Sequence, residues 1–260
     1  MATVREIEQF LFDLAPRELA QEWDNVGLLV GKGDREAHKV LVALDITEAV
    51  VDEAIAGGFD LIVAHHPLIN CSWVPVQAVR WDEHKGRLLM KLIENRIGAI
   101  CMHTNLDSAQ GGVNDVLAKA LGLKEIEPLC TDGLGRIGVL AEELSVEEFA
   151  RFVKERLKAN GIRYTVGSNK SVRRVAVGGG SCSEFASLAA TLGCDAFVTA
   201  DIKYHDFQNA EVLGIHLIDA GHFPTEDVVC PVVAEKLKKA FIGLDVKLSA
   251  RHRDIIQYYV

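Results

Sequence analysis

The sequence predicts an α/β protein of two similar lobes, each a mixed sheet flanked by helices. Short apolar runs rich in β-forming residues alternate with helical patterns, which is typical of a largely buried sheet covered by helices. One stretch of the chain also repeats itself. The length of 260 residues accommodates two lobes of roughly 100–150 residues each.

The predicted elements follow from local patterns. Val4, Ile7 and Leu11 recur at helical spacing and predict a helix over residues 4–14. Ser145 and Glu148 form a capping-box pattern, which predicts a helix from there to about residue 159. The predicted strands cover residues 40–44, 61–65, 98–103, 136–140, 174–178, 196–200 and 215–219, and further helices cover 86–96 and 227–241.

The repeat relates residues 40–63 to residues 175–198 without gaps. Each copy contains a strand, a helix, a Gly, an Asp and a second strand, so the match indicates either a duplication or the pattern that all βαβ units share. We interpret it as two similar lobes, 1–125 and 126–214. The C-terminal segment 215–260 should belong to the first lobe and pack back near the metal cleft that the motifs below predict. The identical pairs are Val40 and Val175, Val42 and Val177, Ala54 and Ala189, Gly58 and Gly193, Asp60 and Asp195, and Val63 and Val198.

Composition excludes several classes of protein. The net charge of −9 disfavours nucleic acid as a partner, because counterion release requires a basic surface. No apolar run approaches the ~18–20 residues that span a bilayer, so we expect no membrane partner. The N-terminus carries Glu6, Glu8 and Asp13 instead of the basic start and apolar core of a signal peptide, which predicts a cytoplasmic protein.

Two adjacent histidines end the second predicted strand, in the sequence Ala64-His65-His66-Pro67. Side chains alternate across a regular strand, so adjacent histidines normally point apart. Pro67 cannot donate to a sheet ladder, so the strand should stop here and both imidazoles can turn toward one cavity. The alternative is one buried and one exposed histidine.

Two further motifs place a histidine and a carboxylate just beyond a strand. They are His103-x-x-x-Asp107 and His222-x-x-x-Glu226. Open α/β sheets bind ligands beyond the carboxyl ends of their strands. For either carboxylate alone, the simpler explanation is a helix cap.

Together the three strand ends favour a metal site. Imidazole nitrogens and carboxylate oxygens suit zinc, iron, manganese, cobalt or nickel. Six such side chains exceed one tetrahedral site and suit a dinuclear cleft of two divalent ions with open positions for water. The six are His65, His66, His103, Asp107, His222 and Glu226.

Three other segments are weaker candidates. The glycine-rich turn 178–181 offers backbone N–H groups to a phosphate, although a tight strand-to-helix turn explains it equally well. Asp24 and Asn25 suit a turn and can support a neighbouring site. The polar residues after the strand 196–200 are candidate pocket residues or a capped helix start, and His205 among them can transfer protons. These residues are Asp201, Lys203, Tyr204, His205 and Asp206.

The ordered motifs AHHPLI, HTNLD, GGGS, ADIKYHD and DAGH-x-x-x-E resemble the Nif-three-like family, whose members are often labelled GTP cyclohydrolase type 2 homologues. The N-terminal WDNVGLLVG is similar to that family as well. The resemblance runs from about residue 4 to the C-terminus. It corresponds to the short form, which lacks an inserted middle domain.

The resemblance implies a fold of two similar lobes with a dinuclear metal centre, and a toroidal homohexamer. It places the metal ligands on His65, His66, Asp107, His222 and Glu226, with His103 beside them. We therefore expect a metal-dependent hydrolase that acts on a nucleotide-like or phosphate-containing small molecule, with His103 or His205 as general acid or base. The alternative is a metal carrier, a metallochaperone or a metal-bound regulatory adaptor.

Apolar residues in potentially exposed places support self-association. The segment 67–85 is either a lid over a substrate pocket or a subunit contact. The residues concerned are Trp73, Val74, Val76, Trp81 and the tail 255–260.

Overall fold

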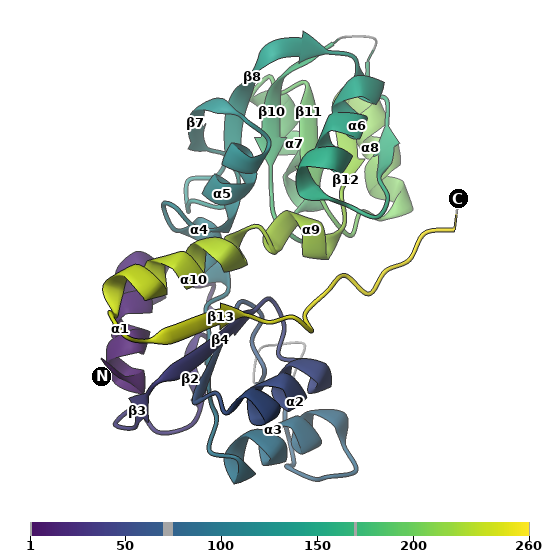
Figure 1. Ribbon diagram of the computed structural model, residues 1–260. Coiled ribbons are helices and arrows are strands. Elements are labelled where there is room, and N and C mark those ends of the chain that lie inside the picture. The colour runs from purple at the N-terminus through teal and green to yellow at the C-terminus, as the bar shows by residue number, and fades with distance from the viewer. Residues whose placement is uncertain (1, 70–74, 169–170, 260) are drawn as a thin grey trace. The chain divides into compact units, whose positions relative to one another are not determined.

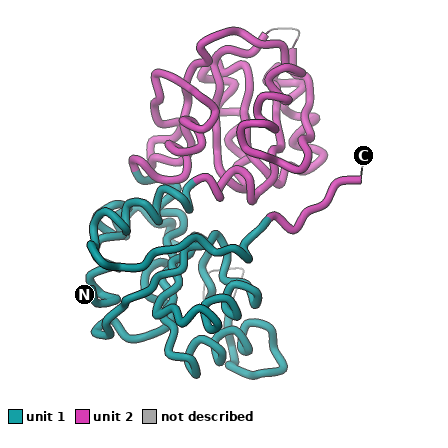
Figure 2. Tube along the Cα trace, in the orientation of Figure 1, with its two compact units in different colours: residues 1–109, 229–253 teal, residues 110–228, 254–260 magenta. Residues whose placement is uncertain are grey.

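A computed structural model describes residues 2–69, 75–168 and 171–259, and it divides into two compact units (Figure 2). Unit 1 comprises residues 1–109 and 229–253, and unit 2 comprises residues 110–228 and 254–260. These bounds differ from the lobes expected above because the segments around 113–120 and 216–219 pack within unit 2. Trp73 and Val74, which we expected at an interface, lie outside the described residues.

Unit 1 is built on a five-stranded sheet with the strand order β13-β4-β5-β6-β2. Figure 1 labels β13, β4 and β2 of this sheet. The first four strands are parallel to their neighbours, and β2 pairs antiparallel with β6. A separate antiparallel pair joins β1 to β3. The strands are β1 (Ala2–Thr3), β2 (Gly27–Val30), β3 (Glu36–Ala37), β4 (Lys39–Ala43), β5 (Leu61–Ala64), β6 (Gly98–Cys101) and β13 (Asp245–Leu248).

The first helix of unit 1 buries the apolar face that its sequence predicts. Val4, Ile7 and Leu11 are the buried residues of α1, which Thr3 caps as part of a capping box. The buried residues of α2 and α3 join one core cluster with alternate residues of β4, β5 and β6. The helical elements are α1 (Val4–Leu14), η1 (Arg17–Leu19), α2 (Glu48–Gly57), α3 (His84–Glu94), α4 (Thr104–Ser108) and α10 (Val229–Ala240).

Unit 2 contains a six-stranded sheet with the order β7-β8-β10-β11-β12-β9. Strands β10, β11 and β12 are parallel, and β8 and β9 pair antiparallel with β10 and β12. The strands are β7 (Lys124–Pro128), β8 (Arg136–Leu144), β9 (Arg163–Thr165), β10 (Val172–Val177), β11 (Ala196–Thr199) and β12 (His216–Asp219).

Helices cover both faces of this second sheet. Phe149 of α6 packs with Val175 in one core cluster, and Ala189 of α7 packs with Phe197 in the other. The predicted capping box of Ser145 and Glu148 is present at the start of α6. The helical elements are α5 (Val113–Ala120), α6 (Val146–Leu157), η2 (Ser183–Phe185), α7 (Ala186–Thr191), α8 (Tyr204–Leu213) and α9 (His222–Glu226).

The topology confirms two similar α/β lobes with mixed sheets. In each unit three parallel strands follow one another, and an antiparallel strand from earlier in the unit pairs with the third. The register is shared too, because Val40 lies opposite Leu61 and Val175 lies opposite Ala196, which is the same spacing. Across the described ranges, no helix combines the length and the apolar character needed to traverse a bilayer.

Candidate metal-binding residues

The two adjacent histidines of unit 1 lie where β5 ends. The backbone N–H groups of His65 and His66 both donate to the Leu44 carbonyl, over 3.1 and 3.0 Å. Two successive residues bonded to one acceptor have left the regular ladder, in which side chains alternate. Their ring centroids are 5.0 Å apart.

His103 brings a third imidazole to this place from the end of β6. Its ring centroid lies 5.1 Å from that of His65 and 5.7 Å from that of His66. Each of the three residues offers a ring nitrogen within 4.8 Å of the other two, a spacing that suits ligands of one metal ion. His65 and His103 are buried, at 2% and 8% exposure.

Each of these rings is oriented through its Nδ1 atom. Nδ1 of His65 lies 2.8 Å from the Met102 carbonyl, and Nδ1 of His66 lies 2.7 Å from Asp45 Oδ1. Nδ1 of His103 lies 2.9 Å from Asp24 Oδ1. Carboxylates and carbonyls hold metal-ligating histidines in this manner, with Nε2 directed at the metal.

Asp24 is a carboxylate with a buried side chain that holds the His103 ring in place. Besides His103, it accepts hydrogen bonds from the Thr104 N–H at 3.0 Å and the Thr104 hydroxyl at 2.5 Å. Burial opposes ionisation of the carboxyl, but the hydrogen bonds from His103 and Thr104 outweigh it and lower the pKa of Asp24 to about 2. Asp24 is therefore ionised at neutral pH and presents a negative charge to the His103 ring.

Asp107 completes the unit 1 group from the short helix α4, whose residues are all buried. Its N–H donates to the His103 carbonyl over 3.0 Å, so the two residues are one helical turn apart. Its Oδ1 lies 3.5 Å from His65 Nε2. Unit 1 therefore gathers three imidazoles and one carboxylate.

Unit 2 gathers its own histidine and carboxylate at the end of β12. Gly221, with φ of +86°, turns the chain into α9. His222 Nε2 lies 3.0 Å from Glu226 Oε2, and its Nδ1 lies 2.6 Å from Asp201 Oδ2. Burial favours the neutral ring, but hydrogen bonds to Asp201 and Glu226 prevail and raise the pKa of His222 to about 11. Two carboxylates thus make this position strongly attractive to positive charge.

The glycine-rich turn 178–181 packs against this group. Its amides at Gly179 and Gly180 donate to Asn114 Oδ1 and Thr225 Oγ1, over 2.8 and 3.0 Å. A Cβ atom at Gly180 would lie 2.2 Å from Glu226 Oε1. Because protein oxygens already accept from these two amides, the turn supports α9, which favours the tight-turn interpretation over a phosphate cradle.

The segment after β11 forms the capped start of helix α8. Asp201 differs from the other polar residues of this segment because it contacts His222, as described above. Asp206 accepts hydrogen bonds from the Lys203 N–H and the Ser183 hydroxyl, over 3.3 and 2.9 Å. His205 lies on the exposed side of α8, with Nδ1 2.9 Å from Gln208 Oε1. Its catalytic role stays a prediction.

Comparison with known proteins assigns the chain to a family. The family described as Duf34/NIF3 (NGG1p interacting factor 3) matches residues 2–255. The chain belongs to the DUF34/NIF3 family.

Relatives of this NIF3-family chain cover nearly all of it. A Streptomyces coelicolor protein named GTP cyclohydrolase 1 type 2 homolog is 40% identical over 248 residues, which cover 91% of this chain and 86% of the relative. A Clostridium perfringens protein with the same name is 35% identical over 242 residues, 91% of each chain. The crystal structure of a Bacillus cereus protein related to NIF3 matches with a TM-score of 0.91 at 28% identity, covering 100% of this chain and 99% of that one.

Membership of the NIF3 family confirms the resemblance noted in the sequence. Sequence reasoning also found the histidines and carboxylates at the three strand ends. It missed Asp45, which holds His66, and gave Asp24 only a supporting role. The available signal was positional, since Asp45 directly follows the predicted strand 40–44, as Asp201 follows 196–200.

Proposed function

We propose that this chain is a metal-dependent hydrolase whose ions are bound by His65, His66, Asp107, His222 and Glu226. The observation that carries the proposal is the orientation of the histidines. The proposed ligands His65, His66 and His222 each have Nδ1 at hydrogen-bond distance from an oxygen acceptor, between 2.6 and 2.8 Å. That is the support which ligating histidines require.

The donor set fits divalent transition metals. Imidazole nitrogens and carboxylate oxygens are the preferred ligands of zinc, iron, manganese, cobalt and nickel. We infer that the unit 1 and unit 2 groups serve one dinuclear centre, because each supplies imidazole and carboxylate donors and the family resemblance assigns them together. Asp107 and Glu226 would then neutralise part of the charge of two ions.

Bound divalent ions lower the pKa of a coordinated water and supply a nucleophile at neutral pH. In this proposal His103 transfers the proton at Nε2, because Asp24 fixes its Nδ1 and stabilises the imidazolium form. The substrate would be a nucleotide-like or phosphate-containing small molecule. The name of the relatives, GTP cyclohydrolase 1 type 2 homolog, supports a nucleotide.

The test is a substrate screen with protein whose metal content has been measured, before and after chelation and restoration. We expect restored protein to hydrolyse a nucleotide or phosphate ester. His103→Gln should lower kcat about 100-fold while metal content stays unchanged. His84→Gln is the matched control, because His84 is exposed at the start of α3 and should leave kcat unchanged.

The opposite result supports the alternative of a metal carrier. Metal-replete protein would then show no turnover above the background of the free ion, and its metal would pass to an apo acceptor protein. That pair of observations would overturn the hydrolase proposal and leave the metal ligands in place.

We also propose that the chain forms a homohexamer, as the family resemblance implies. Large apolar side chains are exposed in the isolated chain, with Trp81 at 52%, Ile255 at 81% and Tyr259 at 105%. Exposed apolar patches commonly mark interfaces. Light scattering at micromolar concentration should give a mass near six chains, and a monomer mass would contradict the proposal.

A further inference from the structure

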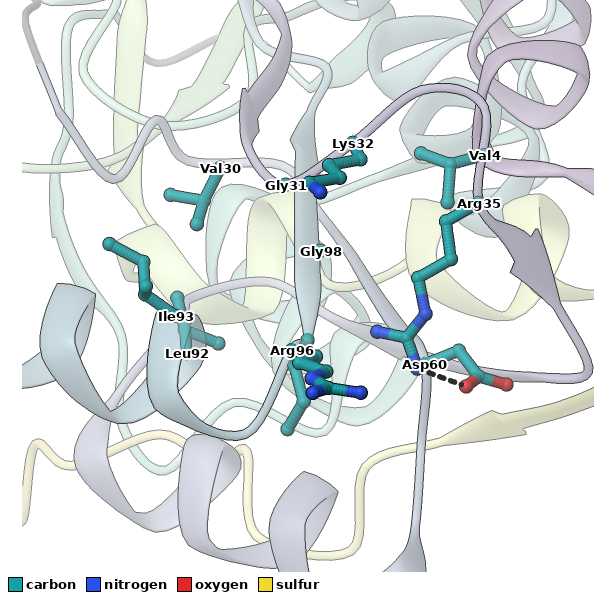
Figure 3. Close-up of a pocket in the computed structure, with 11 residues that line it drawn as sticks. Val4, Val30, Gly31, Lys32, Arg35, Asp60, Leu92, Ile93, Arg96 and Gly98 are labelled. Atoms are coloured by element: carbon teal, nitrogen blue, oxygen red, sulfur yellow. Dashed lines mark hydrogen bonds and ion pairs between the residues drawn. The ribbon is translucent and has the colours of Figure 1, made fainter.

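Unit 1 contains a concave pocket at the opposite end of its sheet from the histidines. Asp60 precedes β5 and Gly98 begins β6, whereas His65 and His103 follow the other ends of these strands. The cavity has a volume of about 710 Å³, which lies within the range of ~300–1,000 Å³ typical of ligand pockets. Figure 3 shows the residues that line it.

Cationic side chains dominate the polar part of this pocket. Lys32, Arg35 and Arg96 line it, and Figure 3 shows their charged groups directed into the space that the lining residues enclose. The one acidic residue among the lining residues, Asp60, is already engaged. It accepts hydrogen bonds from Arg35 Nη2 at 3.1 Å and from the N–H groups of His38 and Lys39 at 2.8 and 3.1 Å. The pocket is therefore positive although the chain carries a net charge of −9.

Arg35 carries a donor for which the pocket offers no acceptor. Its Nη1 atom is buried and has no hydrogen-bond partner among the residues that the structure describes. A ligand cannot reach this enclosed atom, but the Arg35 side chain as a whole is 37% exposed, so its accessible part can meet an anion. The Asp60 contact meanwhile fixes the guanidinium in place.

The remaining wall of the pocket is apolar. Val4, Leu92 and Ile97 are buried beneath it, at 1%, 0% and 2% exposure, and Ile93 is 59% exposed at its edge. Gly31 and Gly98 line the pocket with bare backbone. Their backbones lie close together, since a Cβ atom at Gly31 would lie 3.0 Å from the Gly98 Cα atom. An apolar body can therefore lie against this wall while an anionic group meets the cations.

We propose that this pocket binds a small organic phosphate. Guanidinium groups bind phosphate oxygens through paired, charge-assisted hydrogen bonds, and lysine adds a point charge. The phosphate is bound by Lys32, Arg35 and Arg96, and the apolar or aromatic body packs on Ile93 and on the bare backbone of Gly31 and Gly98. This assignment is independent of the metal-binding residues and of the proposed hydrolysis.

Calorimetric titration with phenyl phosphate tests the proposal. The full chain is first treated with EDTA, so that no metal ion can hold phosphate at the histidines. Lys32→Gln with Arg96→Gln should weaken binding by about tenfold for each cation removed, since each supplies a charge-assisted hydrogen bond. Both residues are exposed, so the variant should fold, and its unfolding temperature verifies this.

The matched control is Arg151→Gln with Lys154→Gln. These residues are exposed on α6 of unit 2 and give the same change in net charge. The control should bind phenyl phosphate as the wild type does. Equal affinity in all three proteins, or no saturation of the wild type by about 10 mM ligand, would overturn the proposal.

Three further ligands test the organic part. Inorganic phosphate and ribose 5-phosphate, which lack an apolar body, should bind more weakly than phenyl phosphate. If adenosine monophosphate binds more tightly than phenyl phosphate, the proposal is supported and the ligand is a nucleotide. If phenyl phosphate binds more tightly, the proposal is supported and the ligand is an organic phosphate other than a nucleotide. If ribose 5-phosphate binds as tightly as both, the apolar wall contributes nothing and the proposal of an organic ligand is wrong.

Discussion

Units 1 and 2 present the same three strand ends with different side chains. Extending the repeat alignment beyond each strand, Asp45 after β4 corresponds to Gly180 after β10, and His66 after β5 corresponds to Asp201 after β11. Only the third strand end is chemically alike, with a histidine followed four residues later by a carboxylate. The shared sheet topology thus fixes where polar side chains emerge and leaves their chemistry to vary.

The consequence is a division of roles between the units. In unit 1 the carboxylates of Asp24 and Asp45 support histidines, and three imidazoles gather. In unit 2 one histidine lies between two carboxylates, Asp201 and Glu226. Unit 1 is therefore rich in imidazole nitrogen donors, and unit 2 is rich in carboxylates.

Removing ligand pairs from each unit should give the largest effect. We expect His65→Ala with His66→Ala to weaken metal binding more than about 100-fold, because two of the gathered imidazoles are lost. His222→Ala with Glu226→Ala should weaken metal binding about tenfold, since the unit 1 group retains most of the donors. Metal content after dialysis against graded chelator measures both. A larger loss from the unit 2 variant would reverse the comparison.

Asp24→Asn should give the next largest effect, on activity. An amide keeps nearly the same shape but carries no charge, so His103 loses the group that stabilises its imidazolium form. Loss of a side chain that orients a histidine in this way typically lowers activity or metal affinity about 10–100-fold. If His103 transfers protons, kcat should fall by that factor while metal content stays within about twofold.

Asp45→Asn is the matched variant, because Asp45 supports His66, a proposed ligand. It should lower metal affinity more than Asp24→Asn does. Identical effects on metal content from both substitutions would contradict separate roles for His66 and His103.

Much of the fold and part of the site could be predicted because the signals are local. The apolar runs predicted β4, β5 and β6, and the motif His103-x-x-x-Asp107 was placed just beyond the strand that became β6. Contacts between distant segments could not be predicted. Asp24 reaches His103 across 79 positions of the chain, and Asn114 reaches the Gly179 amide across 65. The interpretation of the turn 178–181 as a support for α9 depends on the contact between Asn114 and the Gly179 amide.

The pH dependence of stability should separate the two units in metal-free protein. The pKa of Asp24 is lowered from 3.8 to about 2, so its contribution is present above its unfolded value and is lost as the pH falls toward about 2. The pKa of His222 is raised from 6.5 to about 11, so its contribution is present below its unfolded value and is lost as the pH rises toward about 11.

Urea unfolding of wild type, Asp24→Asn and His222→Gln across this range measures both contributions. The deficit of Asp24→Asn should be about 2 kcal/mol near neutral pH and should shrink in acid. The deficit of His222→Gln should shrink in alkali instead. Deficits that vary in the same direction with pH would refute the electrostatic difference between the units.

The smallest expected effect concerns Gly180, which unit 2 has where unit 1 has Asp45. Gly180 and Gly193 both have left-handed backbone, with φ of +64° and +74°. Alanine should cost about 1 kcal/mol of unfolding free energy at either position, because its Cβ strains that conformation. A Cβ atom at Gly193 meets nothing within 4 Å, whereas one at Gly180 lies 2.2 Å from Glu226 Oε1.

Gly180→Ala should therefore displace the Glu226 carboxylate, and Gly193→Ala should not. We expect Gly180→Ala to weaken metal binding severalfold, up to about tenfold, and Gly193→Ala to retain wild-type affinity at a similar stability. Chelator competition together with urea unfolding measures the two quantities separately. Wild-type metal affinity in Gly180→Ala would mean that the position of Glu226 is unimportant for the ions, and the metal centre would then depend on the unit 1 donors alone.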